Sequence, residues 1–272
     1  MSEIVTFFQQ ETFREAAHKV IQKHKQLIQT CIPGVEIRHI GSTATEGLLT
    51  KGDVDLQVRV GDKQFNRARV ALLGLYELNR GSFQTSYFCA FEKMDEQLPL
   101  GVQLTVKHSG IDHFWKVTEF FKGNPTYIQL YNELKRKYEG KEMEAYRKEK
   151  ADFFHQIFAT KEYQVLSKQL EIYDKVKFVR GDQCVQIEDT FHLDRLELLE
   201  LIEQIMKDDS LQQMTLTIQV DRHCPQTVGD TLVDYGFYLQ EEKRQVKKNL
   251  YNEREMKVYR RESEKGVYNE GV

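Results

Sequence analysis

Two aspartates stand two residues apart, at Asp53 and Asp55, in the segment Lys51-Gly52-Asp53-Val54-Asp55-Leu56. In a β-strand, residues two apart project to the same face, so we expect the two carboxylates to lie side by side. Neighbouring carboxylates repel each other unless a proton or a cation lies between them. Mg²⁺ prefers oxygen ligands and is usually held by one or two carboxylates together with substrate phosphates. The pair therefore predicts a magnesium site, with Asp53 and Asp55 as metal ligands and as catalytic residues.

A glycine-serine turn precedes the aspartates. The apolar run that ends at Ile40 stops at Gly41, where the missing side chain lets the backbone approach a ligand closely. Backbone N–H groups and a hydroxyl such as that of Ser42 are donors for phosphate oxygens. We therefore predict that Gly41, Ser42 and Thr43 bind the phosphates of a nucleotide.

Together these residues resemble the signature of the nucleotidyltransferase superfamily, in which an apolar residue and Gly-Ser precede Asp-x-Asp. More narrowly, the chain resembles the GrpB family, and the similar positions are Ile40-Gly41-Ser42-Thr43-Ala44, Gly47-Leu48, Lys51, Asp55, Asn124-Pro125, Tyr131, Leu134-Lys135, Tyr146, Lys150 and Phe153. The resemblance covers roughly residues 1–165. It implies an α+β fold, namely a nucleotidyltransferase-like mixed sheet with flanking helices.

The chain also departs from this family pattern. Many GrpB-type sequences carry Pro-Ile-Ile-Asp where this chain has Gly52-Asp53-Val54-Asp55, so the paired carboxylates favour metal binding here. The superfamily's third carboxylate usually lies on a later strand, which corresponds to residues 102–106, where the family often has His-x-His. Gln103 and Thr105 are neutral, so the third ligand is missing or comes from elsewhere. This departure bears on catalysis more than on binding.

Three lysines lie at positions from which a flexible ammonium group can reach a phosphate with its several negative oxygens. Lys51 stands just before Asp53, while Lys135 and Lys150 border the apolar faces of later helices and match lysines of the family pattern. The alternative is that Lys135 and Lys150 extend their ammonium groups to water along a packed stem, and that Lys51 is an exposed turn lysine. Under the first interpretation all three bind nucleotide.

Hydrophobic periodicity predicts the elements that must position these residues. The expected elements are a helix at about 10–30, the signature strand, turn and Asp-x-Asp strand, a helix over 65–76, and strands over 83–91 and 102–106. From residue 110 to about 168 the pattern is helical. We interpret the aromatic side chains of this part as a helix-on-sheet core rather than a base-stacking platform. A nucleotidyltransferase-like domain is therefore predicted at residues 1–168.

A change in composition near Leu170 predicts a second, smaller α+β domain at residues 170–250. The expected elements are two short strands at 176–179 and 184–187, a helix over 194–206, a strand at 216–220, a short helix at 228–234 and a final strand to about Leu250. Their order and Tyr235-Gly236-Phe237 resemble part of a GNAT-type acetyltransferase, but the closely spaced glycines that cradle its pyrophosphate are missing. We therefore predict an accessory domain without catalysis, followed by a charged tail at residues 251–272.

The composition is that of an ordinary soluble protein. The 272 residues are 30% charged, and the net charge is −3, which gives no general attraction to nucleic acid and predicts no clear nucleic-acid patch. The four cysteines form no C-x-x-C pair and are interpreted as reduced thiols. The sequence begins without a basic and apolar leader, and no apolar stretch is long enough to span a bilayer. We therefore expect a cytoplasmic protein without a membrane partner.

Three functions remain open. The first is nucleotidyl transfer from an NTP to a hydroxyl of a small molecule or macromolecule, with Mg²⁺ held by Asp53 and Asp55, and with catalysis by positioning and electrostatics. The second is a nucleotide- or metal-binding module without turnover, which the missing third carboxylate favours and the retained pair opposes. The third is an acetyltransferase-linked protein, which the missing cofactor turn opposes. The sequence does not identify the acceptor, the nucleotide or the oligomeric state.

Overall fold

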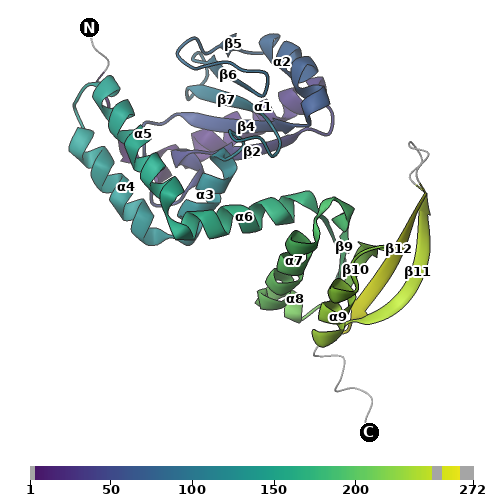
Figure 1. Cartoon of the computed structure of the whole chain (residues 1–272). Coiled ribbons are helices and arrows are strands. Elements are labelled where there is room, and N and C mark those ends of the chain that lie inside the picture. The colour runs from purple at the N-terminus through teal and green to yellow at the C-terminus, as the bar shows by residue number, and fades with distance from the viewer. Residues whose placement is uncertain (1–3, 247–252, 264–272) are drawn as a thin grey trace. The chain divides into compact units, whose positions relative to one another are not determined.

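The computed structural model describes residues 4–246 and 253–263, and its contacts divide the chain into two compact units, residues 1–167 and 168–272 (Figure 1). Each unit has its own sheet and its own hydrophobic core. The α+β fold predicted from the sequence, with a mixed sheet and flanking helices, is confirmed. Within the described ranges, no helix is both long and apolar enough to cross a bilayer.

The first unit is built on a five-stranded sheet with the strand order β2-β4-β7-β6-β5. The strands are β2 (Glu36–Ile40), β4 (Val54–Val60), β7 (Leu100–Val106), β6 (Phe88–Lys93) and β5 (Glu77–Leu78). The central pair β4 and β7 is parallel, and the other neighbours are antiparallel. A separate pair, β1 (Phe8–Gln9) and β3 (Leu49–Thr50), holds the segment that follows the signature turn. Because β4 and β7 run in parallel, Asp55 lies opposite Gly101.

The two faces of this sheet differ in character. Val54, Leu56, Val58 and Val60 alternate along β4 into an apolar core, which they share with α1 (Arg14–Cys31) and α2 (Phe65–Leu73). The intervening residues of β4 are polar and face the other way, as the period of a strand requires. The remaining helices of this unit are α3 (Phe114–Gly123), α4 (Pro125–Tyr138), α5 (Met143–Ala159) and the first part of α6 (Lys161–Lys175), which crosses the boundary between the units. They form an aromatic cluster of their own.

A buried polar network fixes α3 against the polar face of the sheet. Arg59 donates to Asp112 from Nε at 2.8 Å and from Nη2 at 2.6 Å, and its guanidinium is fully buried. Gln57 donates from Nε2 to Asp112 at 2.8 Å and accepts the backbone N–H of Trp115 at 2.9 Å. Because a buried charge is costly unless it is paired, this network holds one arrangement of the start of α3.

The second unit is a five-stranded sheet with the order β11-β12-β10-β9-β8. Its strands are β8 (Lys177–Arg180), β9 (Cys184–Glu188), β10 (Thr215–Asp221), β11 (Tyr238–Val246) and β12 (Glu253–Arg261). The helices are α7 (Arg195–Lys207), α8 (Asp209–Gln212) and α9 (Gln226–Asp234). Asp194 and Glu197 form a capping box that starts α7. The apolar side of α7 packs on the sheet through Leu201 and its neighbours.

The structure corrects two element predictions. Residues 253–261, which the sequence placed in a charged tail at 251–272, form β12 and pair with both β10 and β11. The predicted end of the preceding strand near Leu250 and the end of the predicted tail at 264–272 lie outside the described residues. In the first unit, the strand predicted at 83–91 is β6 at Phe88–Lys93, so the segment before Phe88 is a loop.

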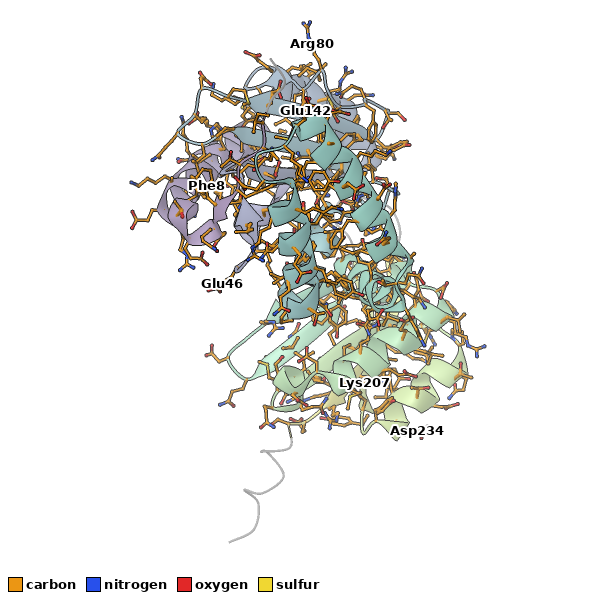
Figure 2. All side chains as sticks on the ribbon, turned by 90° about the vertical axis from the view of Figure 1, so that its left-hand side faces the viewer. Phe8, Glu46, Arg80, Glu142, Lys207 and Asp234 are labelled. Atoms are coloured by element: carbon orange, nitrogen blue, oxygen red, sulfur yellow. The ribbon has the colours of Figure 1, made fainter. Side chains whose placement is uncertain are left out.

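Exposed charged side chains such as Arg80 and Glu46 project outward from the first unit (Figure 2).

Candidate functional site

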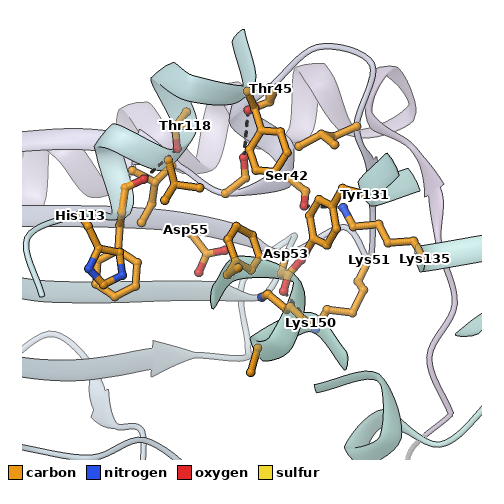
Figure 3. Close-up of a pocket in the computed structure, with 18 of the residues that line it drawn as sticks. Ser42, Thr45, Lys51, Asp53, Asp55, His113, Thr118, Tyr131, Lys135 and Lys150 are labelled. Carbon is orange, nitrogen blue, oxygen red and sulfur yellow. Dashed lines mark hydrogen bonds and ion pairs between the residues drawn. The ribbon is translucent and has the colours of Figure 1, made fainter. Parts of the chain in front are cut away.

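A pocket of about 360 Å³ lies in the first unit, between the polar face of the sheet and helices α3, α4 and α5. Its size is within the range of roughly 300–1,000 Å³ that is usual for small-molecule sites. The pocket brings together most of the side chains that the sequence singled out (Figure 3). These are Gly41, Ser42, Lys51, Asp53, Asp55, Lys135 and Lys150.

The carboxylate of Asp55 lies between two glycines. A Cβ atom on Gly41 would stand 2.8 Å from Asp55 Oδ2, and a Cβ atom on Gly101 would stand 2.6 Å from Oδ1. Both distances are shorter than a normal contact, so a side chain at either glycine would displace the carboxylate. Gly41 also has φ of 78°, a backbone conformation that favours glycine. The turn therefore makes room for Asp55 as well as for a ligand.

The two aspartates differ in their surroundings. Asp53 is the residue just before β4 and forms an ion pair with Lys51 at 3.2 Å, while Asp55 lies within the strand, and both line the pocket. Asp55 lies within β4, where burial and the charge of Asp53 raise its pKa to about 6, while Lys150 and a hydrogen bond from Gln103 act in the opposite direction. A buried carboxylate with a second carboxylate nearby favours a bound proton or cation.

Helix α4 holds the signature turn and the loop after it through two buried polar residues. Lys135 is 1% exposed, and its Nζ donates to Ser42 Oγ at 2.8 Å and to the carbonyl oxygen of Leu49. Asn132, on the same face of α4, accepts the backbone N–H of Leu49 at 2.8 Å and donates to the carbonyl of Gly47 at 2.7 Å. Since Nζ already donates to Ser42, the hydroxyl proton of Ser42 is left for another acceptor.

The burial of Lys135 contradicts one of the two interpretations given to it above, in which its ammonium extends to water. Its ammonium does not extend to water, because Nζ lies 4.0 Å from the ring centre of Tyr131 and inside the wall of the pocket. Burial and the charge of Lys150 hold the pKa of Lys135 well below its usual value. Lys150 and Lys51 are exposed residues that line the same pocket. A polyanionic ligand would therefore meet the positive charges of Lys51 and Lys150 beside the buried amine of Lys135.

Thr43 is the one predicted nucleotide-binding residue that does not line the pocket. The turn at Ser42–Ala44 is a 3₁₀-helix, so successive side chains point in different directions, and Thr43 is buried. Its Oγ1 lies 3.0 Å from Nε2 of His39, and its carbonyl accepts from Gln10 at 2.9 Å. Burial lowers the pKa of His39 to about 4, so this imidazole is neutral at pH 7. Thr43 thus stabilises the turn instead of contacting a ligand in the pocket.

The far end of the pocket is aromatic and apolar. His113 lies there with Phe114 and Phe158, whose rings contact its imidazole. The cavity is also lined by Val117, Phe121, Phe154 and His155. Figure 3 shows His113 at the end opposite Lys51 and Lys135, with Asp55 between them. One cavity therefore combines a charged end with an end suited to a flat apolar group.

The GrpB protein family model matches residues 10–160, which is more than half of the chain. This chain belongs to the GrpB family. It is 27% identical over 153 residues to a UPF0157 protein of Vibrio cholerae, and this match covers 56% of the chain and 80% of that relative. The match to the GrpB family ends close to the boundary between the units. The resemblance of the second unit to an acetyltransferase therefore stays a prediction.

Two solved structures are similar to this GrpB-family chain at low sequence identity. The conserved protein GrpB from Enterococcus faecalis is 18% identical, has a TM-score of 0.45, and is matched over 61% of this chain and 99% of its own. The Cid1 poly(U) polymerase with bound MgGTP is 10% identical, has a TM-score of 0.34, and is matched over 46% of this chain and 42% of its own.

The donor atoms of this GrpB-family pocket fit a hard cation that also binds phosphates. In the part of the chain that the structure describes, no group of three or more His, Cys, Asp or Glu side chains could hold a metal ion. Gln103 stands beside the pair instead: its Nε2 donates to Asp55 Oδ1 at 3.2 Å, and its Oε1 is buried without a hydrogen-bond partner among the described residues. Two carboxylates suit Mg²⁺, which usually completes its shell with phosphate oxygens and water.

Sequence reasoning missed the pocket roles of Gln103, His113 and the aromatic residues. The aromatic side chains were interpreted as core, and Phe121 and Tyr131 do pack in the aromatic cluster, but both also line the pocket. The one signal available for Tyr131 was its place among the positions similar to the family. His113 offered no signal, because the turn that carries it is placed only by the folded chain.

Proposed function

We propose that the pocket of the first unit binds a nucleoside triphosphate with Mg²⁺, and that the protein transfers a nucleotidyl group from it to an acceptor hydroxyl. The observation that carries this proposal is the union, in one cavity, of two carboxylates, a serine hydroxyl and three lysines at one end with aromatic rings at the other. Membership of the GrpB family supports it, because the signature that defines the resemblance is the one that builds the charged end.

At the charged end, each residue has a distinct task. The Ser42 hydroxyl, oriented by Lys135, donates to a phosphate oxygen, and Gly41 leaves room for the carboxylate of Asp55. Lys51 and Lys150 add positive charge that offsets the charge of the triphosphate. Asp53 and Asp55 would hold Mg²⁺, which when bound neutralises phosphate charge as it develops. Catalysis would then consist of positioning and electrostatic stabilisation.

A second candidate is nucleotide binding without turnover. The observation that favours it is the neutral Gln103 beside Asp55, at the place where an additional carboxylate would otherwise activate the attacking hydroxyl. Binding depends on the charged end as a whole, whereas turnover depends on a base for the acceptor proton. The two candidates therefore differ in chemistry and share one ligand.

Isothermal titration of the full-length protein with ATP, CTP, GTP and UTP tests binding, once with Mg²⁺ and once with EDTA. We expect saturable binding that requires Mg²⁺ and is lost in the variants Ser42→Ala and Asp53→Asn. Asp62→Asn, which removes an exposed carboxylate outside the pocket, is the matched control and should bind like the wild type. If none of the four nucleotides binds, both candidates are wrong.

Pyrophosphate release separates the two candidates. The protein, Mg²⁺ and the nucleotide that binds are incubated with a panel of hydroxyl compounds, and pyrophosphate is followed by ³¹P NMR. Release that depends on an acceptor supports nucleotidyl transfer. Tight binding with no release across sugar, polyol, nucleoside and protein hydroxyls supports the binding module.

A further inference from the structure

Near Phe114 and Phe158 the pocket presents a polar ring of defined orientation, that of His113. This residue precedes α3. The centre of its ring lies 5.0 Å from the ring centre of Phe158, in an edge-on contact, and 4.9 Å from the ring centre of Phe114. Phe114 and Phe158 are half-buried and line the pocket. A flat ligand group at this end would therefore meet aromatic rings and the edge of one imidazole.

The tautomer of His113 follows from its hydrogen bond. Nδ1 lies 3.1 Å from the carbonyl oxygen of Gly110, and because a carbonyl can only accept, Nδ1 must carry the proton. Burial holds the pKa of His113 below its ordinary value, so the ring is neutral at pH 7 and Nε2 bears a lone pair. The imidazole edge therefore acts as a hydrogen-bond acceptor and not as a donor.

We infer that the aromatic end binds the base of the nucleotide and that His113 Nε2 accepts a hydrogen bond from an exocyclic amino group of that base. The protein then prefers adenine to hypoxanthine and cytosine to uracil. In each pair, the amino group of the first base is replaced in the second by a carbonyl oxygen, which repels the lone pair of Nε2. This inference rests on the proposed function, because it assumes that the triphosphate occupies the charged end.

Titration calorimetry of the full-length protein with Mg²⁺ and the two matched pairs, ATP with ITP and CTP with UTP, tests this inference. We expect ATP and CTP to bind about tenfold more tightly than their partners, since a hydrogen bond gained in place of a repulsive contact has about this effect. His113→Phe keeps a flat ring but removes Nε2, so ATP and ITP should bind with equal affinity. ATP binding should weaken, and ITP binding should be no weaker than in the wild type, because the repulsive contact is removed as well. His18→Phe, which replaces an exposed histidine outside the pocket, is the matched control and should keep the preference.

Several results would overturn the inference and leave the proposed function intact. These are equal affinities within each pair, a preference for ITP or UTP, a preference that survives His113→Phe, or a preference that is also lost in His18→Phe. Failure of all nucleotides to bind would refute the proposed function and this inference with it.

A second measurement does not depend on any variant. The ¹⁵N chemical shifts of the imidazole, recorded at pH 7 on the wild-type protein, report which ring nitrogen carries the proton. We expect the Nδ1–H tautomer for His113, with a shift at Nε2 when ATP is added. An Nε2–H tautomer would contradict the assignment of Nε2 as the acceptor.

Discussion

Replacing Asp55 by Asn should stabilise the protein at neutral pH while it removes a ligand for Mg²⁺. The pKa of this carboxyl is raised from 3.8 to about 6, first by burial and then by the charge of Asp53. Between these two values the folded state holds a proton that the unfolded state has released, so stability falls as the pH rises through this window. Above pH 6 the full cost of the buried charge is present, and below about pH 4 it is absent.

The size of the effect follows from the pKa. A shift of this size corresponds to about 3 kcal/mol if the whole of it opposes folding. Asp55 keeps part of its surface open to the pocket, where solvent screens its charge, so we discount the cost to about 1.5 kcal/mol. An Asn amide can still accept from Gln103, so that contact is kept. For a domain of this size, the gain corresponds to an increase in Tm of about 3–6 °C.

Thermal melts of wild type and Asp55→Asn in EDTA, at pH 7.5 and at pH 4, provide the assay. The variant should melt at a higher temperature at pH 7.5, and the difference should disappear at pH 4. Addition of Mg²⁺ and ATP at pH 7.5 should raise the Tm of the wild type and leave that of the variant unchanged. A variant that melts lower than the wild type in EDTA, or a difference that is the same at both pH values, would show that the carboxylate has a structural role and refute the reasoning.

Three further predictions concern other parts of the chain. Gly101→Ala should displace the carboxylate of Asp55, since its Cβ atom would lie 2.6 Å from Oδ1. Calorimetry should then show Mg²⁺-dependent ATP binding weakened at least tenfold. Unchanged affinity would contradict the role given to the two glycines that flank Asp55. Burial alone would raise the pKa of Glu36, but Lys107 and Arg59 hold it at about 2. Glu36→Gln should therefore lower the free energy of unfolding, measured in urea at pH 7, by about 1–3 kcal/mol. That cost should shrink as the pH falls from 4.5 toward 2, because the wild-type carboxylate loses its charge there, and a constant cost would exclude the ion pairs as its cause. Residues 1–167 expressed alone should unfold cooperatively in urea; a fragment without a cooperative transition would mean that the second unit completes its core.

The sequence carried enough information to place the charged end of the pocket. Gly41, Ser42 and Asp55 could be found because a strand, a turn and a second strand are local patterns, and because alternation in β4 sends Val54 and Leu56 to the core and Asp55 away from it. The lysines of α4 and α5 were found only as positions in a family pattern. Helical spacing gives the face of a helix, but it does not say what lies opposite that face.

The features that the sequence did not predict depend on contacts between distant segments. Gly101 meets Asp55 because β7 pairs in parallel with β4, and no local pattern specifies that register. Thr43 was misplaced because a 3₁₀ turn, unlike a strand, does not send alternate side chains to one side. Residues 253–261 were assigned to a tail by their charge, although Met256 and Val258 alternate with polar residues and are buried once β12 pairs with β10.

Asp55 and Lys135, two ionisable groups at the charged end, are both shifted toward their neutral forms. Burial raises the pKa of Asp55 and lowers that of Lys135, so the surroundings oppose one negative and one positive charge at the same time. A cation beside Asp55 would favour the carboxylate, and a phosphate near Ser42 and Lys135 would favour the ammonium. Neither a metal ion alone nor an anion alone satisfies both groups. The electrostatics of the pocket therefore argue for a ligand that brings both charges together, as a magnesium complex of a nucleoside triphosphate does.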